Sequence, residues 1–200
     1  MNKYTPLVTA FVLSLSAASA SANLVSNGSF EDPLVNTGDG TPTYDYTSSI
    51  TDWLSGGHDS VLFVSTYQPV ADGDQAVQIE RPGDTLTSLS FATVVSEHYR
   101  LTFAYSSWNN SASSVLYVGA GDATDTFLSS SNSYATQTLD FHATSTSTSL
   151  LFRNDGTLGV SYPQIDSVSV TAVPEPETYA MMLAGLGALG FMSRRRKITD

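Results

Sequence analysis

Strict alternation of apolar and polar residues over positions 98–105 is the feature that most constrains how this chain can fold. The run reads HYRLTFAY, with an aromatic or large aliphatic residue at every second position. Successive side chains of an extended strand point to opposite faces, so this run predicts a strand with one buried and one solvated face.

The rest of the segment from Asn23 to Val173 shows short β-rich runs and no helical periodicity. Turn residues such as Asp72-Gly73 and Asn154-Asp155-Gly156 separate these runs. We expect strands at 60–66, 75–81, 85–95, 98–105, 114–118, 136–143, 148–153 and 165–171. Several short strands with regular turns predict an all-β fold, an antiparallel β-sandwich.

The charge distribution limits the classes of ligand that this segment can bind. The chain has 19 acidic and 8 basic residues and no cysteine. Only Arg81, Arg100 and Arg153 are basic between Asn23 and Val173. Such an acidic body repels nucleic acid and attracts cations, of which calcium is the obvious candidate. Disulfides, a thiol nucleophile and Cys-ligated zinc are excluded.

Residues 1–22 are typical of a signal peptide. Lys3 precedes an apolar centre from Leu7 to Leu15, and Ala20-Ser21-Ala22 fits the small-residue cleavage pattern. We therefore expect the mature chain to begin at Asn23. An uncleaved membrane helix is the alternative, which the short apolar centre disfavours.

The C-terminal segment combines an apolar stretch with a basic run. Residues 178–192 carry no charge, and Arg194-Arg195-Arg196-Lys197 follow. A helix of that length covers about 22 Å, less than the roughly 30 Å of a hydrocarbon layer. The basic run would stay cytoplasmic and keep the body outside. This predicts a transient hold in the inner membrane during processing.

The order of these parts resembles a PEP-CTERM sorting signal, here residues 173–200. Val173-Pro174-Glu175-Pro176 precedes the apolar stretch and the basic run. The resemblance implies a Gram-negative source, recognition by an exosortase, and export to the cell surface or extracellular matrix. Proteins with this signal tend to accompany exopolysaccharide and biofilm formation. An ordinary single-span tail after a proline-rich linker is the alternative.

Residues 23–172 resemble galactose-binding-like jelly rolls, and in particular a plant and bacterial cell-wall family of unknown function. The matching pieces occur in the family's order. They are residues 23–31 (NLVSNGSFE), 50–53 (ITDW, with Asp52 in place of the usual Gly), 72–79 (DGDQAVQI), 99–103 (YRLTF) and 163–170 (PQIDSVSV). The resemblance implies a jelly-roll β-sandwich, a group that includes several carbohydrate-binding modules.

Jelly rolls of this type often hold one structural calcium ion where the first and last strands meet. By motif position, the resemblance implies five ligand residues. They are the Ser29 carbonyl, the Glu31 carboxylate, Asp72, Gln75 and the Asp166 side chain. Oxygen ligands from distant segments suit calcium. The alternative is that Glu31 and Asp166 only cap turns at the end of the sheet.

Sugar binding is the second hypothesis for a site. Glycans are held by aromatic rings and by polar groups that bond their hydroxyls. Trp108 and Asn109 follow the alternating strand, and by parity Trp108 shares a face with Arg100, so we expect these three residues to contact a ligand. Trp108 could instead close the edge of the sandwich. Trp53 is expected in the core.

The sequence favours no catalytic centre. His58-Asp59-Ser60 contains the residue types of a triad, but adjacent residues of a strand point to opposite faces and cannot form a relay. The leading hypothesis is therefore a non-catalytic exported module that binds or scaffolds extracellular polysaccharide. A self-associating surface protein without a glycan site and a matrix glycan hydrolase are the alternatives.

Overall fold

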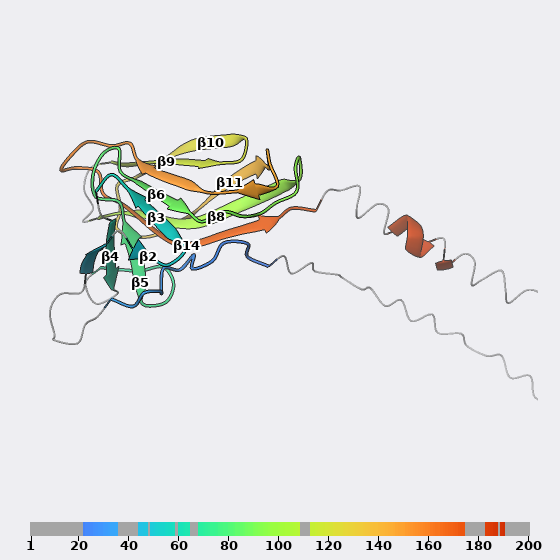
Figure 1. Cartoon of the computed structure of the whole chain (residues 1–200), viewed down its shortest axis with the longest axis horizontal. Helices are drawn as coiled ribbons and strands as arrows, with labels where there is room; N and C mark the ends of the chain where they lie inside the picture. Colours follow the sequence, from blue (N-terminus) through green and yellow to red (C-terminus); the bar gives the residue numbers. More distant parts are fainter. Residues whose placement is uncertain are drawn as a thin grey trace, which may run out of the picture.

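The computed structural model describes residues 22–35, 44–47, 49–58, 60–64, 68–108, 113–174, 183–187 and 189–190. Within these ranges the chain forms two sheets of six strands and one of two (Figure 1). Every pairing between these strands is antiparallel. Most of the expected signal peptide, Asn109, Glu175, Pro176 and the basic run lie outside the described residues.

The first large sheet, here called sheet A, holds the longest strands. In spatial order it contains β1 (Tyr44–Thr47), β4 (Ser60–Val64), β5 (Gln75–Gln78), β14 (Pro163–Ala172), β8 (His98–Ser107) and β11 (Ala135–His142). Strands β14 and β8, each of ten residues, lie side by side near its middle. The alternating run therefore forms a central strand of the sheet.

The second large sheet, sheet B, packs against sheet A. In spatial order it contains β10 (Ala123–Ser129), β9 (Ser114–Ala120), β13 (Leu151–Asn154), β6 (Thr85–Ser88), β3 (Trp53–Gly56) and β2 (Ser49–Ile50). A small third sheet pairs β7 (Phe91–Ala92) with β12 (Ser147–Thr148). The fold is an antiparallel jelly-roll β-sandwich, as the sequence predicts.

The core lies between the two large sheets and is rich in aromatic rings. Phe103 of β8 meets Phe152 of β13 with ring centroids 5.3 Å apart, and Phe152 meets Trp53 of β3 at 6.0 Å. Trp53 is almost fully buried and its indole N–H donates to the Asn27 carbonyl at 3.0 Å. A buried indole needs such an acceptor, so Trp53 both fills the core and fixes the N-terminal segment.

The N-terminal segment completes sheet A where β5 ends. Strand β14 pairs with β5 only at Gln164 and Ile165. Beyond this point Val168 donates its amide hydrogen to Gly28, and Leu24 donates to Val170, so residues 24–28 take over this edge of β14. A Cβ on Gly28 would lie 2.0 Å from the Val168 carbonyl oxygen, which is why glycine is needed here.

Both chain ends of the sandwich meet at β14. The Asn23 side chain accepts an amide hydrogen from Val170 and donates to the Val168 carbonyl, while the Val173 amide donates to the His98 carbonyl. In Figure 1 the blue N-terminal segment and the orange strand β14 reach the same end of the sandwich. Asn23 and Val173 therefore lie at the same end of the body.

Each strand expected from the sequence coincides with described strands. The described residues also contain β1, β2, β3 and β10, which are not in the expected set, and the runs at 85–95 and 148–153 each divide in two. The run at 85–95 divides into β6 and β7, because the chain passes from sheet B to the small third sheet. Strand β10, with the sequence ATDTFLS, was not expected. Five of its seven residues are hydrophilic or small, and it lies at the edge of sheet B, where few side chains are buried.

Candidate functional site

The outer face of sheet A has short side chains at its centre. Thr102 and Ala104 of β8 point outward because their neighbours Leu101 and Phe103 are buried in the core. Thr136 of the neighbouring strand β11 is the cross-strand partner of Ala104, so the two side chains lie next to each other on the same face. Small side chains on neighbouring strands leave a depression between longer ones, and here a loop covers part of it.

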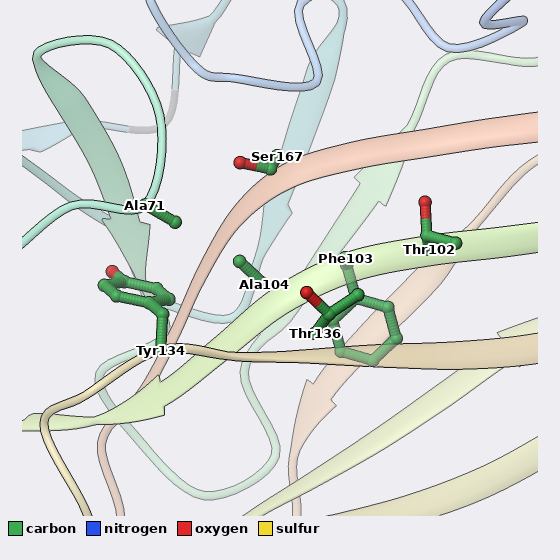
Figure 2. Close-up of a pocket in the computed structure, with 7 residues that line it drawn as sticks. All are labelled: Ala71, Thr102, Phe103, Ala104, Tyr134, Thr136 and Ser167. Carbon is green, nitrogen blue, oxygen red and sulfur yellow. The ribbon is translucent and has the colours of Figure 1, made fainter.

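A cavity of about 420 Å³ occupies this depression (Figure 2). It is lined by Ala71, Thr102, Phe103, Ala104, Tyr134, Thr136 and Ser167. Figure 2 shows Tyr134 on one side of the cavity, Ala71 and Ser167 along another, and Ala104 between them. Its volume falls within the roughly 300–1,000 Å³ of small-ligand sites. None of the lining residues carries a charged side chain.

Tyr134 is the aromatic residue that this cavity presents from a loop. Its hydroxyl oxygen is buried and makes no well-formed hydrogen bond within the described residues, although the Ser106 side chain lies near enough to lower the pKa of Tyr134 slightly. Burial raises the pKa of Tyr134 above its ordinary value, so the hydroxyl stays protonated at neutral pH. The part of Tyr134 that a molecule in the cavity can reach is thus its ring.

A chain of buried side-chain hydrogen bonds supports the sheet beside the cavity. The Ser106 hydroxyl donates to Gln164 Oε1 at 3.0 Å, and Gln164 Nε2 donates to Gln78 Oε1 at 3.1 Å. Gln78 Nε2 then donates to Glu80 Oε1 at 2.6 Å. Ser106 and Gln164 are fully buried. The chain fixes the register of β5, β14 and β8, since a one-residue slip would leave these groups unbonded.

Asp166 holds the loop that covers the cavity. Its buried carboxylate accepts amide hydrogens from Ala71 at 2.7 Å and Asp72 at 2.9 Å on Oδ2, and from Ser167 at 2.6 Å on Oδ1. Burial raises the pKa of Asp166 to about 6, although the three amide hydrogen bonds oppose this. Strand β14 bulges directly after Asp166, with Ser167 at φ +52°.

Glu31 and Gln75 tie the same loop to the N-terminal segment. Glu31 Oε1 accepts amide hydrogens from Asp74 at 2.9 Å and Gln75 at 2.8 Å. The Gln75 side chain donates to the Phe30 and Pro33 carbonyls. Gly73, at φ +62°, packs against Glu31, and a Cβ there would lie 2.4 Å from Glu31 Oε1. The loop therefore needs both the carboxylate and the glycine.

The structure brings the expected calcium ligands to one loop but not to one point. Asp166 and Glu31 direct oxygens at backbone amides, which is the turn-capping alternative. Ser29 and Asp72 line a separate cavity, of about 380 Å³, beside the N-terminal segment. Within the described ranges, no three acidic or histidine side chains form a group that could hold a metal. These side chains as placed do not fit calcium, which stays a prediction.

The expected sugar contacts are not brought together. Trp108 follows the last residue of β8, half-buried, with its ring 5.4 Å from that of Tyr162. Arg100 lies near the other end of β8 and bonds Asp140 through two nitrogens. Eight residues of strand separate Arg100 from Trp108 by roughly 26 Å. Neither side chain lines the cavity at Tyr134, and Asn109 lies outside the described residues.

His58 has an acidic partner that sequence proximity does not reveal. Its Nδ1 lies 3.0 Å from the buried carboxylate of Asp84, and its Nε2 lies 3.2 Å from Arg81 Nη1. Ser60 bonds Ser55 instead. Because Arg81 occupies Nε2, the nitrogen that would act as a base, this cluster braces the turn at residues 81–84 and does not form a catalytic relay.

The sequence interpretation missed the residues that form the cavity. The alternation in residues 98–105 assigns Thr102 and Ala104 to the face opposite Leu101 and Phe103, but nothing in the pattern marks that face as concave. Tyr134 follows the polar run at 129–133, and nothing in the sequence links it to residues 102–104. Two short residues on the outward face of a long central strand were the only hint of a depression in the sequence. This hint is weak unless one also knows that the loop at 71–74 covers that face.

The fold and the tail define an exported protein with a jelly-roll body. The PEP-CTERM protein-sorting motif matches residues 172–197, and this signal directs export across the inner membrane to the cell surface. Residues 23–171 match the family described as "Protein of unknown function (DUF642)", and the chain belongs to that family. The match extends over the whole sandwich.

Solved structures of low sequence identity share the fold. A Stig cyclase from Fischerella sp. TAU has 15% identity and a TM-score of 0.57, covering 78% of this chain and 99% of its own. The cleaved adhesin domain of Lys-gingipain from Porphyromonas gingivalis has 14% identity and a TM-score of 0.50, covering 66% and 98%. An arabinose-bound α-L-arabinofuranosidase has 13% identity and a TM-score of 0.52, covering 76% and 26%.

Two further findings concern the rest of the chain. The search of curated proteins gave no match. Among the described residues, which include short helical pieces at 183–187 and 189–190, no helix is long and apolar enough to cross a membrane.

Proposed function

We propose that this exported protein binds polysaccharide without cleaving it, in the cavity on the outer face of sheet A, and so contributes to an extracellular matrix. The observation that carries the proposal is the cavity itself. Its lining supplies hydroxyl groups from Thr102, Thr136 and Ser167 and the aromatic ring of Tyr134. Sugars offer hydroxyls to polar groups and C–H faces to aromatic rings, so this lining suits them.

The carboxylates near the cavity support a binding role over hydrolysis. Glycoside hydrolysis needs two carboxyl groups on opposite sides of the scissile bond. No Asp or Glu lines the cavity, and both oxygens of the neighbouring Asp166 accept backbone amide hydrogens. A carboxylate whose two oxygens are both engaged in this way is not positioned to attack or protonate a bound glycan. The hydrolase alternative therefore lacks its catalytic pair at this site.

The sheet edges bear on the self-association alternative. Strands β10 and β11 are edge strands of the two sheets. Asp125 accepts the Thr126 amide hydrogen at 2.7 Å, and Asp122 accepts the His142 amide hydrogen at 2.7 Å. These carboxylates occupy backbone donors that a strand of a second copy would need, and charged residues at edges oppose edge pairing. Polysaccharide binding therefore ranks above self-association.

Retention of the protein on immobilised matrix polysaccharide from its own producing cells tests this function. Tyr134→Ala should lower the affinity about tenfold, the equivalent of roughly 1.4 kcal/mol. Trp108→Ala is the matched control, because Trp108 packs on Tyr162 away from the cavity. If only Trp108→Ala loses binding, the site lies at the position predicted from the sequence. If the wild-type protein binds neither the polysaccharide nor its fragments, the proposed function is refuted.

A further inference from the structure

We infer that the cavity at Tyr134 prefers sugars that carry an amine over neutral sugars, and rejects acidic sugars. This inference rests on the proposed function, because it names the class of glycan that the same cavity takes. It follows from the charges that surround the cavity and from the cations that are absent from its lining.

Negative charge lies directly behind the cavity wall. Ala71 and Ser167, which line the cavity, donate their amide hydrogens to the buried carboxylate of Asp166. Asp72 follows Ala71 and donates its own amide hydrogen to Asp166 Oδ2 at 2.9 Å, which brings a second acidic residue next to Asp166. Backbone amides are the only hydrogen-bond donors that the structure gives to Asp166, and no described salt bridge involves it. A cation in the cavity would offset this charge.

The basic residues of the body are already engaged elsewhere. Arg100 lies two residues before Thr102 on β8 and points to the same outer face, which makes it a neighbour of the cavity. Its guanidinium is bound to Asp140 at 2.7 and 2.8 Å. Arg153 binds Asp155, and Arg81 contacts His58. A sugar carboxylate would therefore find no unpaired cation at this cavity and would meet the field of Asp166 and Asp72.

The lining can also accept the hydrogens of an ammonium group. The hydroxyl oxygens of Thr102, Thr136 and Ser167 are acceptors as well as donors. An ammonium group held by them would lie near two carboxylates in a partly enclosed site. Neutral sugars gain only the hydroxyl contacts. The charge difference thus separates sugars of otherwise similar shape.

Binding of three oligosaccharides of equal length to the full chain tests the inference. The probes are oligomers of glucosamine, the same oligomers N-acetylated, and oligogalacturonate, measured by calorimetry at low and high salt. One extra attraction at about 6 Å is worth roughly a three- to tenfold change in affinity near a protein surface. We expect glucosamine oligomers to bind at least about threefold tighter than the acetylated ones, with the difference shrinking in salt.

The outcomes separate the inference from the function beneath it. Equal affinity for the amine and acetylated oligomers, or binding of oligogalacturonate, would overturn the charge preference while leaving glycan binding intact. Binding of none of the three, together with no retention on matrix polysaccharide, would overturn both.

Two variants that each remove one negative charge give a second test of the charge preference. Asp72→Asn removes an exposed carboxylate beside the cavity and should lower the amine-to-acetyl preference about threefold. Asp155→Asn removes the same charge from the body but lies in the loop after β13, so the preference should stay unchanged. Equal effects of both variants would attribute the preference to net charge and overturn the inference.

Discussion

The outer faces of the two sheets are built by the same alternation but differ in what covers them. The face of sheet A is partly covered by the loop at 71–74, which buries Asp166 and leaves a cavity. On sheet B, Tyr117 lies under the Arg153 guanidinium at 4.2 Å, and Arg153 pairs with Asp155. Leu54 on this face remains 57% exposed. A polar strand face therefore becomes a site only where another segment encloses it.

The largest difference should appear when one carboxylate is removed from each face. Asp166→Ala leaves the amides of Ala71, Asp72 and Ser167 without their acceptor in a buried place, so the free energy of unfolding should fall by about 3 kcal/mol. Asp155→Ala breaks a partly exposed ion pair and should cost no more than about 1 kcal/mol. Urea unfolding measures both. Similar losses would mean that the loop does not depend on Asp166.

The pH dependence of stability should also separate the two faces. The pKa of Asp166 in the folded state, about 6, lies above the ordinary value of 3.8. The folded protein therefore binds a proton that the unfolded chain does not bind between about pH 4 and 6. Stability should rise as the pH falls through this window, by up to about 3 kcal/mol, and decline as the pH rises through 6.

Asp155 behaves in the opposite sense, because the neighbouring Arg153 lowers its pKa. Its contribution is present above its unfolded pKa and is lost only in more acidic solution. Urea unfolding at pH 4.5, 5.5 and 7 distinguishes the two carboxylates. Asp166→Asn should flatten the profile in this range, whereas Asp155→Asn should leave it unchanged.

A smaller effect is expected from the tyrosine of each face. Tyr134→Phe removes a buried hydroxyl that makes no well-formed hydrogen bond and should stabilise the unliganded protein by about 1 kcal/mol, while glycan binding, which depends on the ring, should change little. Tyr117→Phe keeps the ring under Arg153 and should change neither quantity. Thermal unfolding and polysaccharide retention measure the two effects. Destabilisation by Tyr134→Phe would show that its hydroxyl is bonded in the free protein.

Chelation tests whether the loop over sheet A also holds a cation. Capping of Ala71, Asp72, Asp74 and Gln75 by carboxylates predicts that EDTA leaves the Tm unchanged. A bound structural ion would add several degrees to the Tm, which EDTA would remove. A fall of that size, restored by added calcium, would support the ligand set that the resemblance implies.

The sequence predicted the sandwich better than the site because the two depend on different physical signals. Alternation in HYRLTFAY specified both faces of β8, and the position of Trp53 in the core follows from its place in the resemblance. The cavity depends on how a loop at 71–74 folds over residues 102–104 and meets Tyr134, contacts that are distant in the chain. Likewise the partner of His58 is Asp84, whereas the sequence offered the adjacent Asp59.

The position of β14 has a mechanical consequence for a protein displayed on a cell. The strand continues directly into the tail, and it lies between β5 and β8 and is bonded to β8 along nearly its whole length. A pull on the tail, such as drag from flowing liquid, acts along the strand axis. Its rows of hydrogen bonds would then be loaded in parallel and must yield together, whereas peeling an edge strand breaks them one at a time. The C-terminal end of the body thus lies on one of the elements best able to resist force.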